Sequence, residues 1–229
     1  MSQPFPFDAV IFDLDGTLVA TDLFWIPAAR AATRRVFRER GITRPEPSGE
    51  EWMKLVGHPM AIGLRIVLPD LGNADLLALQ EACIEEEERA LSAHGATLLP
   101  GAERALTRLA ELGVPMGIAS NCGRNYLEHM LVDLGLDRWV TEARCLDTPG
   151  ILNKLEMVAD LMETFGAERG AMIGDRRGDM HAGAANGLFC VAYTGAFGDP
   201  VAEMGADLAT DDLGVLPELL ASTVWRPER

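Results

Sequence analysis

The stretch Asp13-Leu14-Asp15-Gly16-Thr17-Leu18 decides the fold, because it begins at the last residue of the apolar run DAVIFD, residues 8–13. A short apolar run that ends in an acid predicts a buried strand. Two carboxylates two residues apart point the same way while the chain stays extended, and Gly16 then permits a sharp turn. This pattern predicts a ligand site at the end of a central strand. An isolated stretch of this kind fits a solvated acidic turn about as well, so the rest of the chain decides between the two.

Strand-like and helix-like segments alternate through most of the remaining sequence. Four later segments resemble the first strand and predict further strands at residues 114–120, 139–145, 171–175 and 188–192. Helix-like segments lie at residues 103–112, 126–134, 152–165 and 180–185. This alternation implies right-handed crossovers. We therefore expect an α/β fold, a doubly wound parallel sheet with helices on both faces.

The residues from 19 to 95 break this alternation. They contain only helix-like segments, at residues 26–40, 50–56, 60–68 and 74–93, joined by turns that contain Pro and Gly. An all-helical block that begins just after the first strand predicts an inserted domain. We expect a core domain formed by residues 1–18 and 96–229, and a helical insert formed by residues 19–95.

Composition narrows the class of protein. The chain has 229 residues, 48% of them hydrophobic, and a formal net charge of −15. So acidic a surface disfavours nucleic acid and anionic lipid as partners, and no apolar run reaches the ~20 residues that span a bilayer. The amino terminus lacks the pattern of a secretory signal, and the four cysteines are scattered, which indicates reduced thiols. We expect a cytoplasmic protein without a membrane or nucleic-acid partner.

Polar side chains also follow two later strands. Ser120 and Asn121 end one of them and supply a hydroxyl and an amide that can donate hydrogen bonds to phosphate oxygens. The sequence AMIGDRRGD at residues 171–179 places Asp175 at another strand end and Asp179 one helical turn later. Lys154, one of only two lysines in the chain, opens a helix between these strands. A compact ammonium there could reach a phosphate group.

These motifs, in this order, resemble the haloacid dehalogenase superfamily. The resemblance covers the whole chain, since the helical cap of subclass I directly follows the first motif, and it points to the phosphoglycolate-phosphatase-like and β-phosphoglucomutase-like group. It implies a Rossmann-like core with an inserted cap, and a Mg²⁺-dependent reaction. Asp13 would attack a phosphoryl group, and Asp15 would protonate the leaving oxygen and then activate water. Members that dehalogenate lack the second acid, so Asp15 implies phosphoryl transfer.

The resemblance also implies the ligands of the metal. Asp13, the backbone carbonyl of Asp15, and Asp175 would hold Mg²⁺, with Asp179 acting from further out.

It further implies the substrate contacts. Ser120 and Lys154 would bind the phosphoryl oxygens and share in catalysis, with Asn121 and Thr17 beside them. His58, in the loop Val56-Gly57-His58-Pro59, lies where capped relatives often place a substrate-contacting loop.

We therefore expect a Mg²⁺-dependent phosphatase that hydrolyses a small phosphorylated metabolite through an aspartyl-phosphate, as a monomer or a homodimer. One alternative is a sugar phosphomutase of the β-phosphoglucomutase kind, although the histidine that such caps normally carry is missing between residues 21 and 53. Another is a non-catalytic phosphate-binding regulator. The presence of both Asp13 and Asp15 argues against it, because loss of either acid is the simple route to inactivity.

Overall fold

A computed structural model describes residues 4–224 and divides the chain into two compact units. One unit is built from Met1–Val19 and Leu98–Arg229, and the other is the continuous segment Ala20–Thr97. The segment Ala20–Thr97 occupies nearly the same stretch, residues 19–95, for which the sequence predicts an insert. The first unit extends to Val19 because Val19 forms a bridge with Leu98, and Leu99 N–H donates to Leu18 C=O at 2.8 Å.

The first unit is built on a parallel sheet of six strands in the order β3-β2-β1-β4-β5-β6. The strands are β1 (Ala9–Phe12), β2 (Met116–Ala119), β3 (Val140–Arg144), β4 (Gly170–Gly174), β5 (Phe189–Tyr193) and β6 (Leu208–Thr210). The chain leaves the central strand β1 toward β2 and β3, and later returns to its other side for β4, β5 and β6. The prediction of a doubly wound parallel α/β fold is confirmed.

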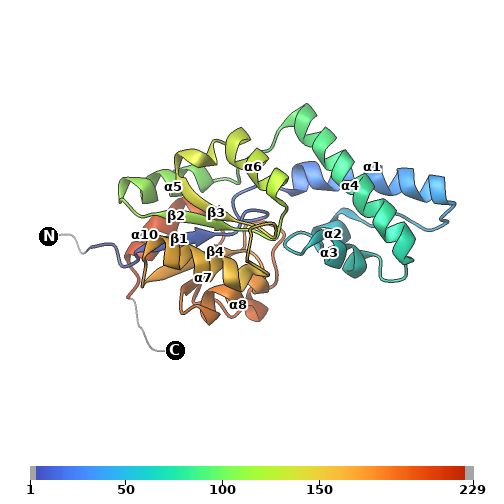
Figure 1. The fold of residues 1–229 in the computed structure, drawn as a ribbon. Coiled ribbons are helices and arrows are strands. Elements are labelled where there is room, and N and C mark those ends of the chain that lie inside the picture. Colours follow the sequence, from blue (N-terminus) through green and yellow to red (C-terminus); the bar gives the residue numbers. More distant parts are fainter. Residues whose placement is uncertain (1–3, 225–229) are drawn as a thin grey trace. The chain divides into compact units, whose positions relative to one another are not determined.

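Helices cover both faces of this sheet, with α5 and α6 on one side and α7 and α8 on the other (Figure 1). The helices of this unit are α5 (Ala102–Glu111), α6 (Arg124–Asp133), α7 (Lys154–Phe165), α8 (Arg177–Ala185), α9 (Val201–Met204) and α10 (Leu216–Ala221), with short 3₁₀ turns at Leu136–Arg138 and Leu213–Val215. Every residue of β1 is fully buried, which is why its sequence is continuously apolar. Alternate residues serve opposite faces, and Ala9 and Ile11 pack into the core beneath α7 and α8.

The second unit is entirely helical in its regular structure. It contains α1 (Asp22–Arg40), α2 (Gly49–Met53), α3 (Met60–Val67) and α4 (Asn73–His94). The two long helices α1 and α4 pack along each other (Figure 1). Trp25 and Trp52 form an edge-to-face pair with ring centroids 6.1 Å apart, and the Trp25 indole N–H donates to the Trp52 carbonyl at 3.3 Å.

Two differences from the sequence-based expectation have physical causes. Helix α1 begins at Asp22, a turn before the expected start at residue 26, and it keeps Pro27 inside the helix. Strand β6 was not expected, because three residues give too short a pattern to separate from a loop. None of the helices between residues 4 and 224 is long and apolar enough to cross a membrane.

Candidate active site

The register of the sheet brings three of the predicted residues to one edge. Phe12 of β1 is level with Ile118 of β2 and with Ile173 of β4. Asp13, Ser120 and Asp175 therefore lie at or just beyond the carboxyl ends of three neighbouring strands. The chain reverses its direction of travel across the sheet at β1, and such a switch point is where open α/β sheets bind ligands.

The backbone of the turn after β1 lies in close contact with the Asp175 side chain. The Leu14 carbonyl accepts hydrogen bonds from the N–H groups of Leu18 at 2.9 Å and Val19 at 3.0 Å, and Gly16 has φ of 79°. A β-carbon on Gly16 would lie 2.7 Å from Asp175 Oδ2, closer than a real side chain allows. Glycine is required here for both the backbone conformation and the close approach.

Lys154 joins two of the carboxylates. Its Nζ lies 2.5 Å from Asp13 Oδ1 and 2.7 Å from Asp179 Oδ1, and the side chain is almost fully buried. It is the first residue of α7, whose start is capped by the Asn153 side chain accepting from Glu156 N–H at 3.1 Å. Burial alone lowers the pKa of Lys154, but the carboxylates of Asp13 and Asp179 outweigh burial and raise it above its ordinary value. Lys154 is therefore a fixed positive charge.

The charged forms of Asp13 and Asp175, unlike that of Lys154, are disfavoured by their surroundings. Burial raises the pKa of Asp13 well above its ordinary value, against the lowering effect of Lys154, and the neighbouring Asp179 and Asp175 raise it further. Burial also raises the pKa of Asp175 to about 7, although Arg176 acts to lower it. The charged forms of both acids thus lack sufficient compensation from the protein itself. A cation bound between them would supply it.

The donor set fits a hard divalent cation. Asp13, Asp175 and Asp179 each offer a carboxylate oxygen, and these atoms lie within 4.8 Å of one another. Asp13 Oδ2 and Asp175 Oδ2 are buried and accept no hydrogen bond from the described residues. Carboxylate oxygens are the ligands that Mg²⁺ prefers in proteins. These two oxygens would hold such an ion, and Arg176 Nε lies 3.3 Å from the Asp175 Oδ2 atom.

Asp179 accepts hydrogen bonds through both of its oxygens, whereas Asp13 and Asp175 each have one oxygen that accepts none from the described residues. Oδ1 accepts from Lys154 Nζ, and Oδ2 accepts from the backbone N–H of Arg176 at 2.9 Å. Both oxygens are thus already engaged, so this carboxylate orients Lys154 and shapes the start of α8. The side chain of Arg176 lies within 3.3 Å of Asp175 Oδ2 and 3.3 Å of Asp199 Oδ1.

Other predicted site residues occupy varied surroundings. Thr17 is fully buried, and its hydroxyl donates to Asp175 Oδ1 at 3.3 Å, so it contacts a candidate metal ligand. Ser120 is 2% exposed, and its Oγ accepts from Cys122 N–H at 3.3 Å. Asn121 is half-buried beside it. His58 is an exposed residue of the helical unit, so the core geometry does not include it.

The structure adds a residue that the sequence did not suggest. Tyr126, in the first turn of α6, donates its phenolic hydroxyl to Asp15 Oδ1 at 2.5 Å. These residues are 111 positions apart, and a lone tyrosine in a helix carries no sequence signal of such a contact.

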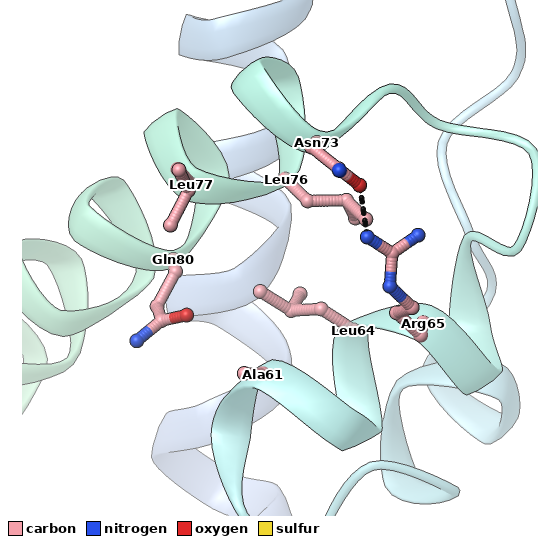
Figure 2. A pocket seen from close by; sticks show the side chains of 7 residues that line it. All are labelled: Ala61, Leu64, Arg65, Asn73, Leu76, Leu77 and Gln80. Carbon is pink, nitrogen blue, oxygen red and sulfur yellow. Dashed lines mark hydrogen bonds between the residues drawn. The ribbon is translucent and has the colours of Figure 1, made fainter.

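A separate hollow lies within the helical unit, between α3 and α4 (Figure 2). It has a volume of about 240 Å³. Leu64 and Leu76 form its apolar wall, and Arg65 donates a hydrogen bond to the Asn73 side chain at its rim. None of the predicted catalytic or metal-binding residues lines this hollow.

Comparison with known proteins places the chain in a family. The model of a family described as haloacid dehalogenase-like hydrolases matches residues 10–193, which is most of the chain. Curated relatives include the phosphoglycolate phosphatase of Pseudomonas syringae pv. syringae, 27% identical over 240 residues, covering 95% of this chain and 84% of the relative. That of Rhodobacter capsulatus is 27% identical over 231 residues, covering 95% of this chain and 98% of the relative.

Solved structures share the fold. The crystal structure of a predicted phosphoglycolate phosphatase from Haemophilus somnus superposes with a TM-score of 0.81 at 18% identity, covering 93% of this chain and 97% of that one. The structure of a putative β-phosphoglucomutase from Thermotoga maritima gives a TM-score of 0.70 at 21% identity, covering 95% of this chain and 100% of that one. The resemblance inferred from the motifs is confirmed, and the chain belongs to the haloacid dehalogenase-like hydrolases.

Proposed function

We propose that this hydrolase is a Mg²⁺-dependent phosphatase, which hydrolyses a small phosphomonoester through an aspartyl-phosphate on Asp13. One observation carries the proposal. The buried Asp13 carboxylate is held through one oxygen by Lys154, while its other oxygen accepts no hydrogen bond from the described residues. An anionic nucleophile needs this kind of fixed, partly compensated carboxylate. The curated phosphatase relatives support the same reaction class.

Asp13 and Lys154 would carry out the first step together. One carboxylate oxygen of Asp13 attacks phosphorus, the bond from phosphorus to the leaving oxygen breaks, and an acyl phosphate forms. Covalent attack divides one difficult displacement into two easier ones. Lys154 is already in contact with Asp13, so it offsets negative charge where the anionic phosphoryl group must approach. Mg²⁺, held by Asp13 and Asp175, would add electrostatic stabilisation of the transferring oxygens.

Asp15 would act as the general acid and then as the general base. Its half-buried carboxyl follows the nucleophile by two residues, on the turn shaped by Gly16. In the first step it gives a proton to the leaving oxygen, and in the second it takes one from the water that attacks phosphorus. Ser120 and Asn121, beyond the end of β2, supply donors for the phosphoryl oxygens. We assign Thr17 to holding Asp175, because its hydroxyl already donates to that carboxylate.

The substrate class follows from the relatives rather than from the site. Several curated relatives are phosphoglycolate phosphatases, so 2-phosphoglycolate is the first substrate to test. A phosphomutase would use the same core, but its cap normally carries a histidine that the stretch between residues 21 and 53 lacks. No observation in this structure favours the phosphomutase over the phosphatase.

The test is a release assay for inorganic phosphate on a panel of phosphorylated metabolites that includes 2-phosphoglycolate and hexose phosphates. Each substrate is assayed with Mg²⁺ and with excess chelator, and wild type is compared with Asp13→Asn. We expect Mg²⁺-dependent release from at least one small phosphomonoester, lost in the variant. Full activity in chelator would overturn the metal assignment. Interconversion of hexose phosphates without net release would favour the phosphomutase.

Two further expectations stay predictions. The scattered cysteines, which indicate reduced thiols, predict a cytoplasmic protein. A monomer and a homodimer are equally compatible with the sequence.

A further inference from the structure

The hydrogen bond between Tyr126 and Asp15 lies at the centre of the proposed chemistry. Tyr126 Oη donates to Asp15 Oδ1 across 2.5 Å. Charge-assisted bonds from a hydroxyl to a carboxylate have lengths of about 2.5–2.7 Å and are stronger than neutral ones. Both side chains are half-buried, so water competes only partly for this contact.

The start of α6 is firmly anchored, so Tyr126 is presented from a fixed position. The backbone N–H of Arg124 donates to Asp147 Oδ2 at 2.8 Å, and its guanidinium donates to the Asp147 carbonyl at 2.7 Å. Asp147 lies in the loop after β3, the strand next to β2. Gly123, the residue just before the helix, packs closely against Asp147. A β-carbon on Gly123 would lie 3.3 Å from Asp147 Oδ2. These contacts do not involve the Tyr126 hydroxyl.

We propose that Tyr126 is a positioning residue for Asp15, an inference that rests on the proposed phosphatase function. The phenol holds Oδ1 as an acceptor, and Oδ2 then carries the proton that passes to the leaving group. The same bond can persist when Oδ2 is protonated and when it is not, because Oδ1 accepts in both states. A single orientation of Asp15 thus serves the acid step and the base step. A mobile carboxyl would have to be ordered in each transition state.

This role predicts a loss that depends on the leaving group. An alkoxide leaving group needs a proton in the transition state, whereas a nitrophenolate departs without one. General acid catalysis contributes typically ~10²–10⁴-fold, and misplacement of its donor forfeits part of that. We expect Tyr126→Phe to slow phosphorylation by an alkyl phosphomonoester about 10–100-fold, with KM nearly unchanged, and phosphorylation by para-nitrophenyl phosphate less than about 3-fold.

The experiment measures single-turnover phosphorylation rates by rapid acid quench for both substrates. The variants are Tyr126→Phe, Asp15→Asn and the double variant. Tyr193→Phe is the matched control, because Tyr193 is the only other tyrosine in the chain and is buried at the end of β5. Phenylalanine keeps the ring, and melting temperatures verify that each variant is folded.

The expected pattern is specific to positioning. Tyr126→Phe loses activity mainly on the alkyl substrate, Tyr193→Phe on neither, and adding Tyr126→Phe to Asp15→Asn costs little more, because the residues act as a unit. Equal losses on both substrates, multiplicative losses in the double variant, or wild-type rates for Tyr126→Phe would overturn the inference. A wild-type protein that turns over neither substrate would instead overturn the proposed function, and the role of Tyr126 with it.

Discussion

Replacement of Lys154 by alanine is the perturbation whose consequences the structure defines best. The ammonium contacts Asp13 at 2.5 Å and Asp179 at 2.7 Å, and only 6% of the residue is exposed. Its removal leaves two buried carboxylates without their shared cation. Breaking a buried ion pair in this way typically costs ~3–5 kcal/mol of stability, less what is recovered when an acid takes up a proton.

The effect on rate follows from the same contacts. Loss of one electrostatic donor in a water-excluded site typically costs ~10²–10³ in rate. Lys154 also acts to lower the pKa of Asp13, so the variant should hold more of this nucleophile in its protonated, inactive form. Because the anionic fraction grows as pH rises through the pKa, the small residual activity of Lys154→Ala should keep rising with pH up to a higher pH than the activity of wild type does.

The assay is kcat/KM on one substrate for Lys154→Ala, Lys154→Arg and Lys54→Ala, with melting temperatures for each. Lys54 is the only other lysine in the chain and is exposed in the helical unit, so Lys54→Ala should match wild type. Arginine should not fully rescue, because its planar fork cannot replace a compact ammonium between two acids. Near-wild-type activity in both Lys154 variants would refute the reasoning.

Three further predictions concern the carboxylates. Asp13→Asn should abolish turnover while circular dichroism shows an intact fold, because an amide is not an anionic nucleophile; wild-type rates, after deamidation is excluded, would place the nucleophile elsewhere. In chelator, the melting temperature should fall as pH rises from about 4 to about 7. Asp175 has a pKa of about 7 in the folded protein against an ordinary 3.8, so in this range the folded protein keeps a proton that the unfolded chain has lost. Mg²⁺ should restore stability most at the high end of that range, and equal stabilisation by Mg²⁺ at pH 5 and pH 8 would contradict this linkage. Gly16→Ala should lower both the Mg²⁺ response and the stability, by ~1–2 kcal/mol for the left-handed backbone alone, and an unchanged melting curve would argue against the close approach to Asp175.

Much of the fold could be predicted because buried parallel strands leave a clear pattern. Strands β1, β2, β4 and β5 lie within or beside apolar runs, whereas β3, with the sequence VTEAR, is only partly buried and carries a weaker pattern. The alternation of strands with helices implies the doubly wound sheet. Strand β6 has three residues and so offers no period to detect. Proline usually stands in the first turn of a helix, whereas Pro27 lies further in. The early start of α1 is therefore not predicted by the sequence.

The candidate site was predictable only as far as strand ends locate residues. Asp13, Ser120 and Asp175 follow neighbouring strands, so topology alone places them at one edge. Contacts that depend on how a helix is anchored to a neighbouring loop could not be predicted in this way. The bond from Tyr126 to Asp15 depends on how α6 is anchored to the loop after β3, and no spacing in the sequence encodes that anchor.

Identification of the covalently modified residue during turnover tests the central claim most directly. An aryl phosphate with a good leaving group is mixed with wild-type protein and Mg²⁺, quenched during steady turnover, and reduced with borohydride, which converts aspartyl-phosphate to homoserine. Peptide mass spectrometry then locates the homoserine. The proposed mechanism predicts homoserine at position 13, dependent on substrate and on Mg²⁺, and absent from Asp13→Asn. Homoserine at any other position, or turnover retained in Asp13→Asn, would contradict the mechanism.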